Sequence, residues 1–303
     1  VDDIEKRTTG FEARPYALAN PQFKDYPLFG EFRGHDNPEQ IITLEPQPQL
    51  IFKTFATMGY DPAELQKKTG IPVVVLNYGD FFGYQKVLYK SIRMMGKILC
   101  KEKRAEEIIA FFDAAIADLD RRTANIEESD KKSCYVGGIS FKGPLDFRST
   151  EPAYPPFMFT HSKHVAYDPA SPLSYITHTS VAKEKIIEWD PDIAFADLSS
   201  ILSAPDANVL NELKDDPAYR QLRAVKSGEV YGVLPYNSYA QNFGSVLADS
   251  YFVGKVLYPE RFKDINPKDK ADEIYTFLVG KPVFEAVNKA FGGKIFSKLK
   301  IEN

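Results

Sequence analysis

The stretch NPEQIITLEPQPQLIF, residues 37–52, indicates the fold because it joins a capped helix to a buried strand. Asn37 is a favourable N-cap, and Pro38 suits the first helical position, where its missing N–H is not needed. Pro46 and Pro48 end the helix. The following QLIF is expected as a buried strand with apolar residues on both faces.

A second stretch, VAKEKIIEWDPDIAFAD at residues 181–197, repeats this order of helix, proline and strand. Further strands are expected in IPVVVLN (71–77), SCYVGGIS (133–140) and GEVYGVLP (228–235). A helix that leads into a short buried strand is typical of α/β layers with a parallel sheet. One copy in each half of the chain predicts two α/β lobes with mainly parallel central sheets.

The longest helical pattern lies between these halves. No Pro or Gly occurs from Lys101 to Ser129, and apolar residues recur there at helical spacing. We expect one long rigid helix that joins the lobes; the alternative is a surface helix of one domain. The expected organisation is an N-terminal lobe at 1–100, a connecting helix at 101–129, and a C-terminal lobe with terminal helices at 130–303.

Composition and motifs argue against several classes of function. The 303 residues carry a net charge of −4 without a basic run, which argues against nucleic-acid binding. No apolar stretch is long enough to span a bilayer, and the chain opens without the pattern of a signal peptide. The two cysteines, Cys100 and Cys134, are expected as free, mostly buried thiols. Motifs of nucleophilic, phosphate-binding or zinc-dependent enzymes are absent from the sequence.

Histidines are few, which bears on a metal site. His161 and His164 lie in a proline-rich stretch, so we expect both to be solvated. Because the sequence offers no compact set of His, Asp and Glu, a metal held in an organic chelate is favoured over a bare Zn²⁺ or Mn²⁺ ion.

The ordered set of motifs resembles the substrate-binding proteins of ABC importers for chelated metals, including receptors for ferric siderophores, haem and cobalamin. The resemblance covers roughly residues 37–260 and is carried by the two helix-strand phrases, IPVVVLN, IRMMGKILCKEKRAEEII, and LRAVKSGEVYGVLP. It implies two α/β lobes joined by one long helix, with a ligand cleft between them. It also implies a monomer that is periplasmic or a cell-surface lipoprotein, binds no cofactor and delivers its ligand to a membrane permease.

The resemblance has one departure and one further implication. The family usually opens with strands that precede the position where this chain begins, and VDDIEKR is similar to the end of such a strand. In the family, acidic residues on each lobe contact arginines of the permease. Glu64 or Asp61 in the N-terminal lobe, and Asp206 or Glu212 in the C-terminal lobe, are the matching candidates.

Ligand contacts are expected just beyond the carboxyl ends of parallel strands. Aromatic rings there would stack on a planar chelate, and arginines would pair with its anionic groups. The candidates are Arg14, Tyr16, Tyr78, Phe81, Phe82, Phe141, Arg148, Ser149, Thr150, Tyr154, Tyr236, Asn237, Tyr239 and Asn242. The segment 141–157 is central to this set because it is too polar and Pro-rich for a buried element. The alternative is a packed loop in which Arg148 pairs with an acid.

Three functions remain open from the sequence. The first is an extracytoplasmic binding protein that captures an iron or other metal chelate. The second is a binding protein for a different small solute, such as an oxyanion or a sugar. The third is an enzyme of two α/β lobes, which would need a group of perturbed titratable residues in its cleft.

Overall fold

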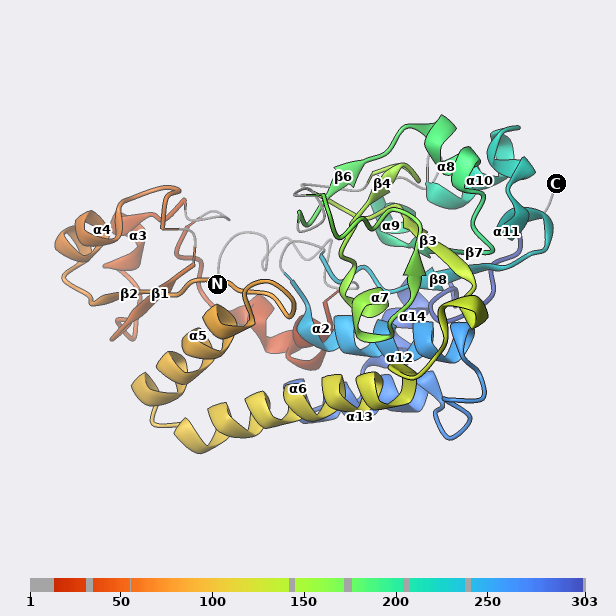
Figure 1. Ribbon diagram of the computed structural model, residues 1–303. Coiled ribbons are helices and arrows are strands. Elements are labelled where there is room, and N and C mark those ends of the chain that lie inside the picture. The colour runs from red at the N-terminus through yellow and green to blue at the C-terminus, as the bar shows by residue number, and fades with distance from the viewer. Residues whose placement is uncertain are drawn as a thin grey trace. The chain divides into compact units, whose positions relative to one another are not determined.

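A computed structural model describes residues 14–30, 35–54, 56–141, 145–171, 176–203, 208–237 and 241–301 (Figure 1). The opening VDDIEKR lies outside these ranges. The chain divides into an N-terminal unit of Val1–Glu12 and Tyr16–Ala110, and a C-terminal unit of Ala13–Pro15 and Phe111–Asn303. The prediction of two α/β units with parallel sheets is confirmed.

The N-terminal unit is built from short helices around a small parallel sheet. Its elements are η2 (Pro21–Asp25), α3 (Pro38–Ile41), β1 (Ile51–Lys53), α4 (Pro62–Thr69), β2 (Val73–Val75) and α5 (Gln85–Ile98). Two helices, α2 (Pro15–Ala19) and α6 (Glu102–Thr123), contain residues of both units.

The opening phrase forms a capped helix and a parallel strand as expected, but the helix already ends at Ile41, and the expectation of a buried strand is wrong because Ile51 and Phe52 are only half-buried. The Asn37 side chain accepts a hydrogen bond of 2.9 Å from the backbone N–H of Gln40 and so caps α3. Strand β1 then pairs in parallel with β2, with Ile51 opposite Val73. Ile41, Leu65 and Ile71 form the buried core beneath the two strands.

The C-terminal unit holds the larger sheet and most of the helices. Its strands are β3 (Ser133–Gly137), β4 (Ser149–Thr150), β5 (Lys163–His164), β6 (Thr179–Ser180), β7 (Ile193–Asp197) and β8 (Val230–Val233). Its helices are η3 (Glu128–Asp130), α7 (Pro155–Phe159), α8 (Lys183–Trp189), α9 (Ser199–Ser203), α10 (Val209–Asp215), η5 (Tyr219–Gln221), α11 (Arg223–Lys226), α12 (Phe243–Leu257), α13 (Pro267–Val279) and α14 (Phe284–Ala290).

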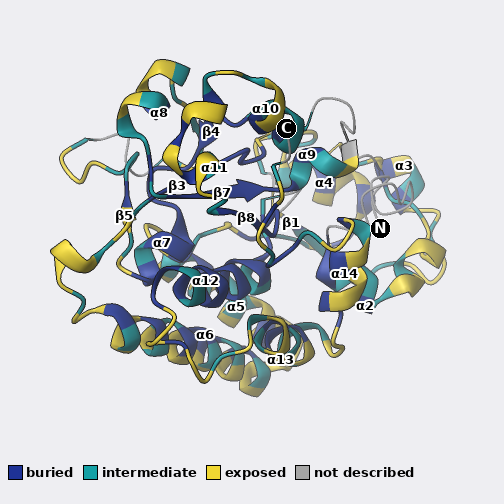
Figure 2. Cartoon of the chain, turned by 90° about the vertical axis from the view of Figure 1, so that its right-hand side faces the viewer, coloured by how far each residue is buried: buried dark blue, intermediate teal, exposed yellow. Residues whose placement is uncertain are grey.

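Four parallel strands form the central sheet of this unit in the order β5-β3-β7-β8. Figure 2 shows β3, β7 and β8 as buried strands, with α12 and α7 on one side and α8, α10 and α11 on the other. Phe195 at the centre of β7 packs edge-on against Phe157 of α7 and Phe252 of α12, at ring-centroid distances of 5.4 and 6.4 Å. Because helices cover both faces, the middles of β3, β7 and β8 are mainly apolar and buried.

The connecting helix is shorter than the sequence predicts. Helix α6 runs from Glu102 to Thr123, and a turn follows it before η3, so the expected continuation to Ser129 is wrong. The Thr123 hydroxyl donates to the Leu119 carbonyl at 2.8 Å, and Asn125 just beyond is a poor helix former. The division between the two units falls inside α6, between Ala110 and Phe111. Its role as a rigid connection stays a prediction.

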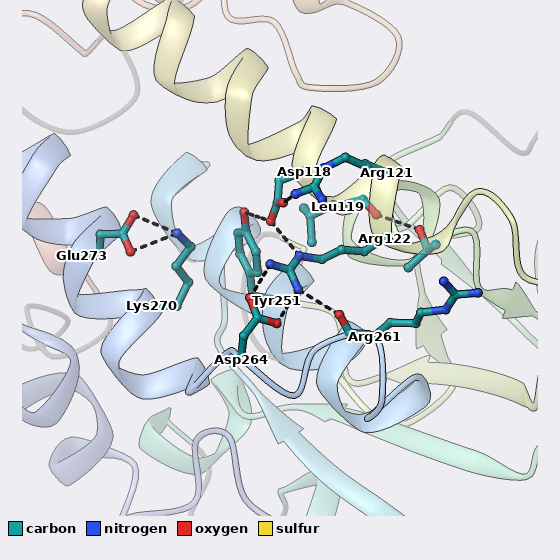
Figure 3. A network of polar contacts seen from close by, with 10 residues as sticks. Asp118, Leu119, Arg121, Arg122, Tyr251, Arg261, Asp264, Lys270 and Glu273 are labelled. Atoms are coloured by element: carbon teal, nitrogen blue, oxygen red, sulfur yellow. Dashed lines mark hydrogen bonds and ion pairs between the residues drawn. The ribbon is translucent and has the colours of Figure 1, made fainter.

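Arg122 fastens the last turn of α6 to the segment that follows α12 (Figure 3). Its guanidinium donates to both carboxylate oxygens of Asp264 at 2.7 Å, to the Arg261 carbonyl at 2.8 Å and to Asp118 at 2.9 Å. The Tyr251 hydroxyl donates to the same Asp118 oxygen at 3.1 Å. These contacts lie within the C-terminal unit, and they fix the end of α6 to α12 and to the segment that follows α12.

We expect Arg122→Met to destabilise the C-terminal unit by about 1–3 kcal/mol, because several charge-assisted hydrogen bonds are lost together. Arg121→Met is the matched control: Arg121 is the adjacent residue, its side chain is 72% exposed, and it pairs with Asp118 one turn away. We expect that control to change stability by roughly 0.5 kcal/mol or less. Urea unfolding of both variants measures the difference, and equal midpoints would contradict the anchoring role.

The two cysteines differ in exposure. Both thiols are free; Cys134 is buried, but Cys100 is exposed, so the expectation of buried thiols is wrong for Cys100. Burial raises the pKa of the Cys134 thiol. Across the described residues, we find no helix whose length and apolar character suit a membrane crossing.

Candidate functional site

The parallel strands of the C-terminal unit finish side by side. Strands β3, β7 and β8 end at Gly137, Asp197 and Val233. The residues that follow, 138–141, 198–199 and 234–237, are called the carboxyl edge below. Ligands of open parallel sheets bind at such an edge.

Side-chain hydrogen bonds link the three loops of the carboxyl edge. The Ser199 hydroxyl donates to the Gly138 carbonyl at 3.3 Å, which links the loops after β7 and β3. The Asn237 amide donates to the Ser140 carbonyl at 3.2 Å, which links the loops after β8 and β3. Asn242 also donates its side-chain amide to the Tyr236 carbonyl at 3.2 Å. These bonds therefore hold the three loops of the carboxyl edge together.

The segment expected to be an exposed polar loop is largely internal. From Phe147 to Phe157, Arg148 alone is exposed, so the expectation that 141–157 is too polar to be buried is wrong for this part. Ser149 and Thr150 form β4, which pairs with β6, and the Ser149 hydroxyl donates to the Ile139 carbonyl at 2.5 Å. Pairing with β6 satisfies backbone groups of β4, and the Ile139 carbonyl satisfies the Ser149 hydroxyl, so neither needs water.

An exposed cation and two stacked rings lie around the β4–β6 pair. Arg148 directly precedes β4, and its guanidinium donates to Asp146 at 2.6 and 3.0 Å, as the alternative interpretation predicts. Its backbone carbonyl accepts from Val181 N at 3.0 Å, just after β6. The His178 ring, just before β6, stacks on Phe141 at 4.7 Å with an interplanar angle of 4°. Partial burial lowers the pKa of His178 and favours its neutral form.

Beneath this surface lies a buried group of carboxyls and phenols. Glu151 accepts a hydrogen bond from the Tyr236 hydroxyl. Asp197 and Asp249 are fully buried; one oxygen of Asp197 accepts from Ser199 N at 2.8 Å, and one of Asp249 accepts from Leu234 N at 2.9 Å. We call Asp197, Asp249 and Glu151 the buried carboxyl group.

Burial dominates the protonation of these acids. It raises the pKa of Asp197 to about 7, and it raises the pKa of Asp249 well above its usual range. The second oxygens of Asp197 and Asp249 have no hydrogen-bond partner of ordinary geometry among the described residues, nor does the Tyr154 hydroxyl, which is near Asp249. Burial therefore favours the protonated form of Asp249, and Asp197 titrates near neutral pH.

The sequence predictions did not include these acids. Asp197 is the last residue of the apolar strand IAFAD, and Asp249 interrupts the apolar helix SVLADSYFV. A lone acid at a strand end or inside an apolar helix face is the signal that could have found them.

The structure places most of the predicted contacts of the C-terminal unit at or below the carboxyl edge. Phe141 and Arg148 are exposed, and Asn237 is half-buried. Ser149, Thr150, Tyr154, Tyr236 and Asn242 are buried, so they lie beneath the surface of the edge. Arg14, just before α2, is also buried. Tyr239 lies outside the described residues.

The predicted contacts of the N-terminal unit follow β2. Tyr78 and Phe82 are exposed, whereas Phe81 is buried. One oxygen of Asp80 accepts hydrogen bonds from the backbone N–H groups of residues 82, 83 and 84 at 2.7 to 2.9 Å, which fixes this loop. Tyr16 is half-buried, and its ring lies 6.5 Å from that of Phe23.

The predicted permease contacts differ in their surroundings. Glu64 is exposed in the first turn of α4, and Asp61 caps that helix by accepting from Ala63 N at 2.9 Å. Glu212 is half-buried and accepts from Phe147 N at 2.7 Å, and burial raises its pKa. Asp206 lies outside the described residues.

A bare-metal site is not formed by the described residues, which contain no cluster of three potential His, Cys, Asp or Glu ligands. His161 is partly exposed and bonds to Asp120 at 2.8 Å. His164 is buried against the Pro152 carbonyl at 3.0 Å, so the expectation that it is solvated is wrong. Burial lowers the pKa of His164 to about 4.

Comparison with known families accounts for this arrangement. Residues 33–236 match the family described as Periplasmic binding protein. The chain belongs to the periplasmic binding protein family. Among curated periplasmic binding proteins, it is 21% identical over 230 residues to the uncharacterized ABC transporter substrate-binding lipoprotein YvrC of Bacillus subtilis (strain 168). That match covers 75% of this chain and 67% of YvrC. The resemblance to ABC substrate-binding proteins is thus confirmed.

Solved periplasmic binding proteins share the fold. The molybdate-binding protein MolA of Haemophilus influenzae, bound to molybdate, has a TM-score of 0.63 and 18% identity, over 90% of this chain and 84% of MolA. The triscatecholate siderophore-binding protein FeuA of Bacillus subtilis, complexed with ferri-bacillibactin, has a TM-score of 0.51 and 18% identity, over 82% of this chain and 89% of FeuA. At these identities the likeness shows the fold alone.

Proposed function

We propose that this periplasmic binding protein captures a metal chelate outside the cytoplasm and delivers it to an ABC permease. The observation that carries the chelate assignment is the flat Phe141–His178 stack on the same β4–β6 pair as exposed Arg148. Stacked rings suit a planar or aromatic chelator, and a guanidinium suits its anionic groups. FeuA, whose bound ligand is ferri-bacillibactin, has the same fold.

A small oxyanion is the second candidate, because MolA has the same fold and binds molybdate. A small oxyanion needs a compact set of donors, and rings add little to its binding. The exposed ring of Phe141, stacked on His178, therefore favours a larger ligand with aromatic or planar parts. A sugar would also use such rings, so it belongs among the ligands to test.

Catalysis is less well supported than binding. The buried carboxyl group contains the most strongly perturbed acids of the carboxyl edge, but Asp197 and Asp249 have no exposed surface. A general acid or base must reach the reacting atoms. These acids instead hold the backbone of the edge loops through Ser199 and Leu234.

The proposed partner is a membrane permease, and the proposed location is the periplasm or the cell surface as a lipoprotein. The lipoprotein YvrC supports this assignment. Exposed Glu64 on α4 is our first choice for a contact with a permease arginine. Glu212 is a second choice, because its carboxylate already accepts a hydrogen bond from Phe147 N.

We expect Arg148→Met to weaken binding of an anionic ferric chelate roughly tenfold, because one charge-assisted contact is lost. Arg223→Met is the matched control: Arg223 is also exposed and pairs with Asp190 and Asp192, which precede β7 at the opposite edge of the same sheet. The control should bind normally. Titration calorimetry measures both affinities, and equal losses would argue against a ligand at the carboxyl edge.

A thermal-shift screen tests the solute class. The panel contains haemin, cobalamin, ferric catecholate, hydroxamate and citrate chelates, their metal-free forms, molybdate and common sugars. A ligand at about 100 times its dissociation constant adds about 2.7 kcal/mol of stability, which is worth several degrees for a chain of this size. A shift with one chelate and none with its metal-free form is the expected result. A shift with molybdate or a sugar alone would overturn the chelate assignment.

A further inference from the structure

The turn between α5 and α6 exposes large aliphatic side chains. All seven residues from Lys97 to Lys103 are exposed. Leu99 is 50% exposed, and Ile98 and Met95 are each 38% exposed. Contiguous apolar side chains that face solvent mark a surface that contacts something else. We call residues 95–103 the α5–α6 corner; it lies within the N-terminal unit (Figure 1).

The close packing of α5 against α6 keeps these aliphatic side chains exposed. Gly96 faces Ala105 so closely that a Cβ at Gly96 would lie 2.6 Å from the Ala105 Cβ. Arg93 and Glu106 bridge the two helices through hydrogen bonds of 2.7 and 2.9 Å. Cys100 has a φ of 53°, and Lys101 N donates to the Gly96 carbonyl at 2.7 Å. The helices are thus clamped together, and the aliphatic side chains stay on the outside.

The corner and helix α5, which leads to it, are basic in an acidic protein. Residues 95–103 contain three Lys and one Glu, and α5 before them adds Lys86, Lys90 and Arg93 without an acidic residue, although the whole chain has 38 basic and 42 acidic residues. Lys86, Lys90 and Lys97 are exposed and share one face of α5 by helical spacing. Within the described parts of the chain, these three lysines and Lys101 form no ion pair.

We propose that the α5–α6 corner docks on an anionic lipid surface. Ile98 and Leu99 would enter the headgroup region, while Lys97 and Lys101 reach lipid phosphates with their ammonium groups. A second copy of the chain is a poorer occupant, because pairing two corners brings two sets of lysines together. The apolar contact is small, so this docking orients a protein already held near the membrane and does not anchor it.

Docking on lipid does not depend on which solute the protein carries. The docking proposal and the chelate assignment can therefore be tested separately. Its test uses the full chain labelled at Cys100 with an environment-sensitive fluorophore, because Cys100 is exposed while Cys134 is buried. Vesicles of phosphatidylglycerol should shift the emission to the blue, and vesicles of phosphatidylcholine should not. The shift should disappear at high salt. No shift with phosphatidylglycerol, or the same shift with both lipids, overturns the proposal.

Variants separate the two parts of the contact. Vesicle flotation of Lys97→Gln/Lys101→Gln should show weaker partitioning, by roughly fivefold for each lysine. Leu99→Ser should also weaken partitioning at constant charge. The matched control, Lys67→Gln/Lys68→Gln, removes the same charge from exposed lysines on α4 of the same unit. Equal losses in the control and the corner variant would show a general charge effect and would overturn the docking site.

Discussion

Gly137→Ala is expected to destabilise the C-terminal unit by about 3 kcal/mol or more, because an added methyl group would overlap packed atoms. A Cβ at Gly137 would lie 2.4 Å from both the ring Cδ2 and the carbonyl oxygen of Phe147. The Phe147 ring is fully buried and packs edge-on against Tyr135 and Tyr219 at 5.2 and 5.3 Å. Relief of the overlap would therefore require a shift of this buried ring and of the Phe147 backbone. Chemical denaturation measures the loss.

Gly83→Ala is the matched control for this prediction. Gly83 is exposed, and the atoms nearest to a Cβ added there, the Asp80 carboxylate oxygens, would lie 4.0 Å away. We expect a change of roughly 0.5 kcal/mol or less there. If Gly137→Ala is as mild as Gly83→Ala, β3 can move away from Phe147 and the carboxyl edge is less tightly fixed than its contacts indicate.

Asp197→Asn is expected to become increasingly stabilising, relative to the natural protein, as pH rises. The folded-state pKa of Asp197, about 7, lies above its ordinary value of 3.8. At acid pH both folded and unfolded chains hold the proton, so the acid and the amide are nearly equivalent. Between these two pKa values the unfolded chain ionises while the folded chain must keep its proton. The natural protein then loses stability on the order of 4 kcal/mol that the amide variant retains.

Asp216→Asn is a control of opposite sign. Lys183 donates to the Asp216 carboxylate and lowers its pKa, so this acid stabilises the folded chain at neutral pH and the contribution is lost as pH falls. The amide variant should therefore be less stable than the natural protein at neutral pH and similar to it in acid. Unfolding midpoints from pH 2 to 8 measure both variants, because this range extends below the ordinary aspartate pKa of 3.8, where both differences should vanish. A constant difference between Asp197→Asn and the natural protein would show that Asp197 is ionised in the folded state.

Local sequence patterns were enough for most of the fold. Asn37 caps its helix as predicted, and the apolar runs 71–77, 133–140 and 228–235 each contain a parallel strand. These features depend on neighbours in the chain, so a single sequence carries the signal. The end of α6 at Thr123 was missed because a Thr hydroxyl that donates to the carbonyl four residues earlier also occurs inside helices, so it gives no clear stop signal in the sequence.

The site was harder to predict because burial depends on distant partners. Ser149 and Thr150 have polar side chains, yet pairing with β6 buries them. Tyr236 becomes internal through its bond to Glu151, which lies 85 residues earlier in the chain. Arg148 could be expected at the edge from its position after a strand, but its pairing with Asp146 requires the turn geometry. Tertiary contacts decide which side chains of a polar loop face solvent.

The most direct measurement is calorimetric titration of the full chain with a ferric tris-catecholate and, separately, with the metal-free catecholate and with molybdate. The proposal predicts saturable binding of the ferric chelate to one site, no comparable binding of the other two, and a roughly tenfold loss in Arg148→Met. Tight binding of molybdate without binding of any ferric chelate in the panel would contradict the account and assign this binding protein to an oxyanion.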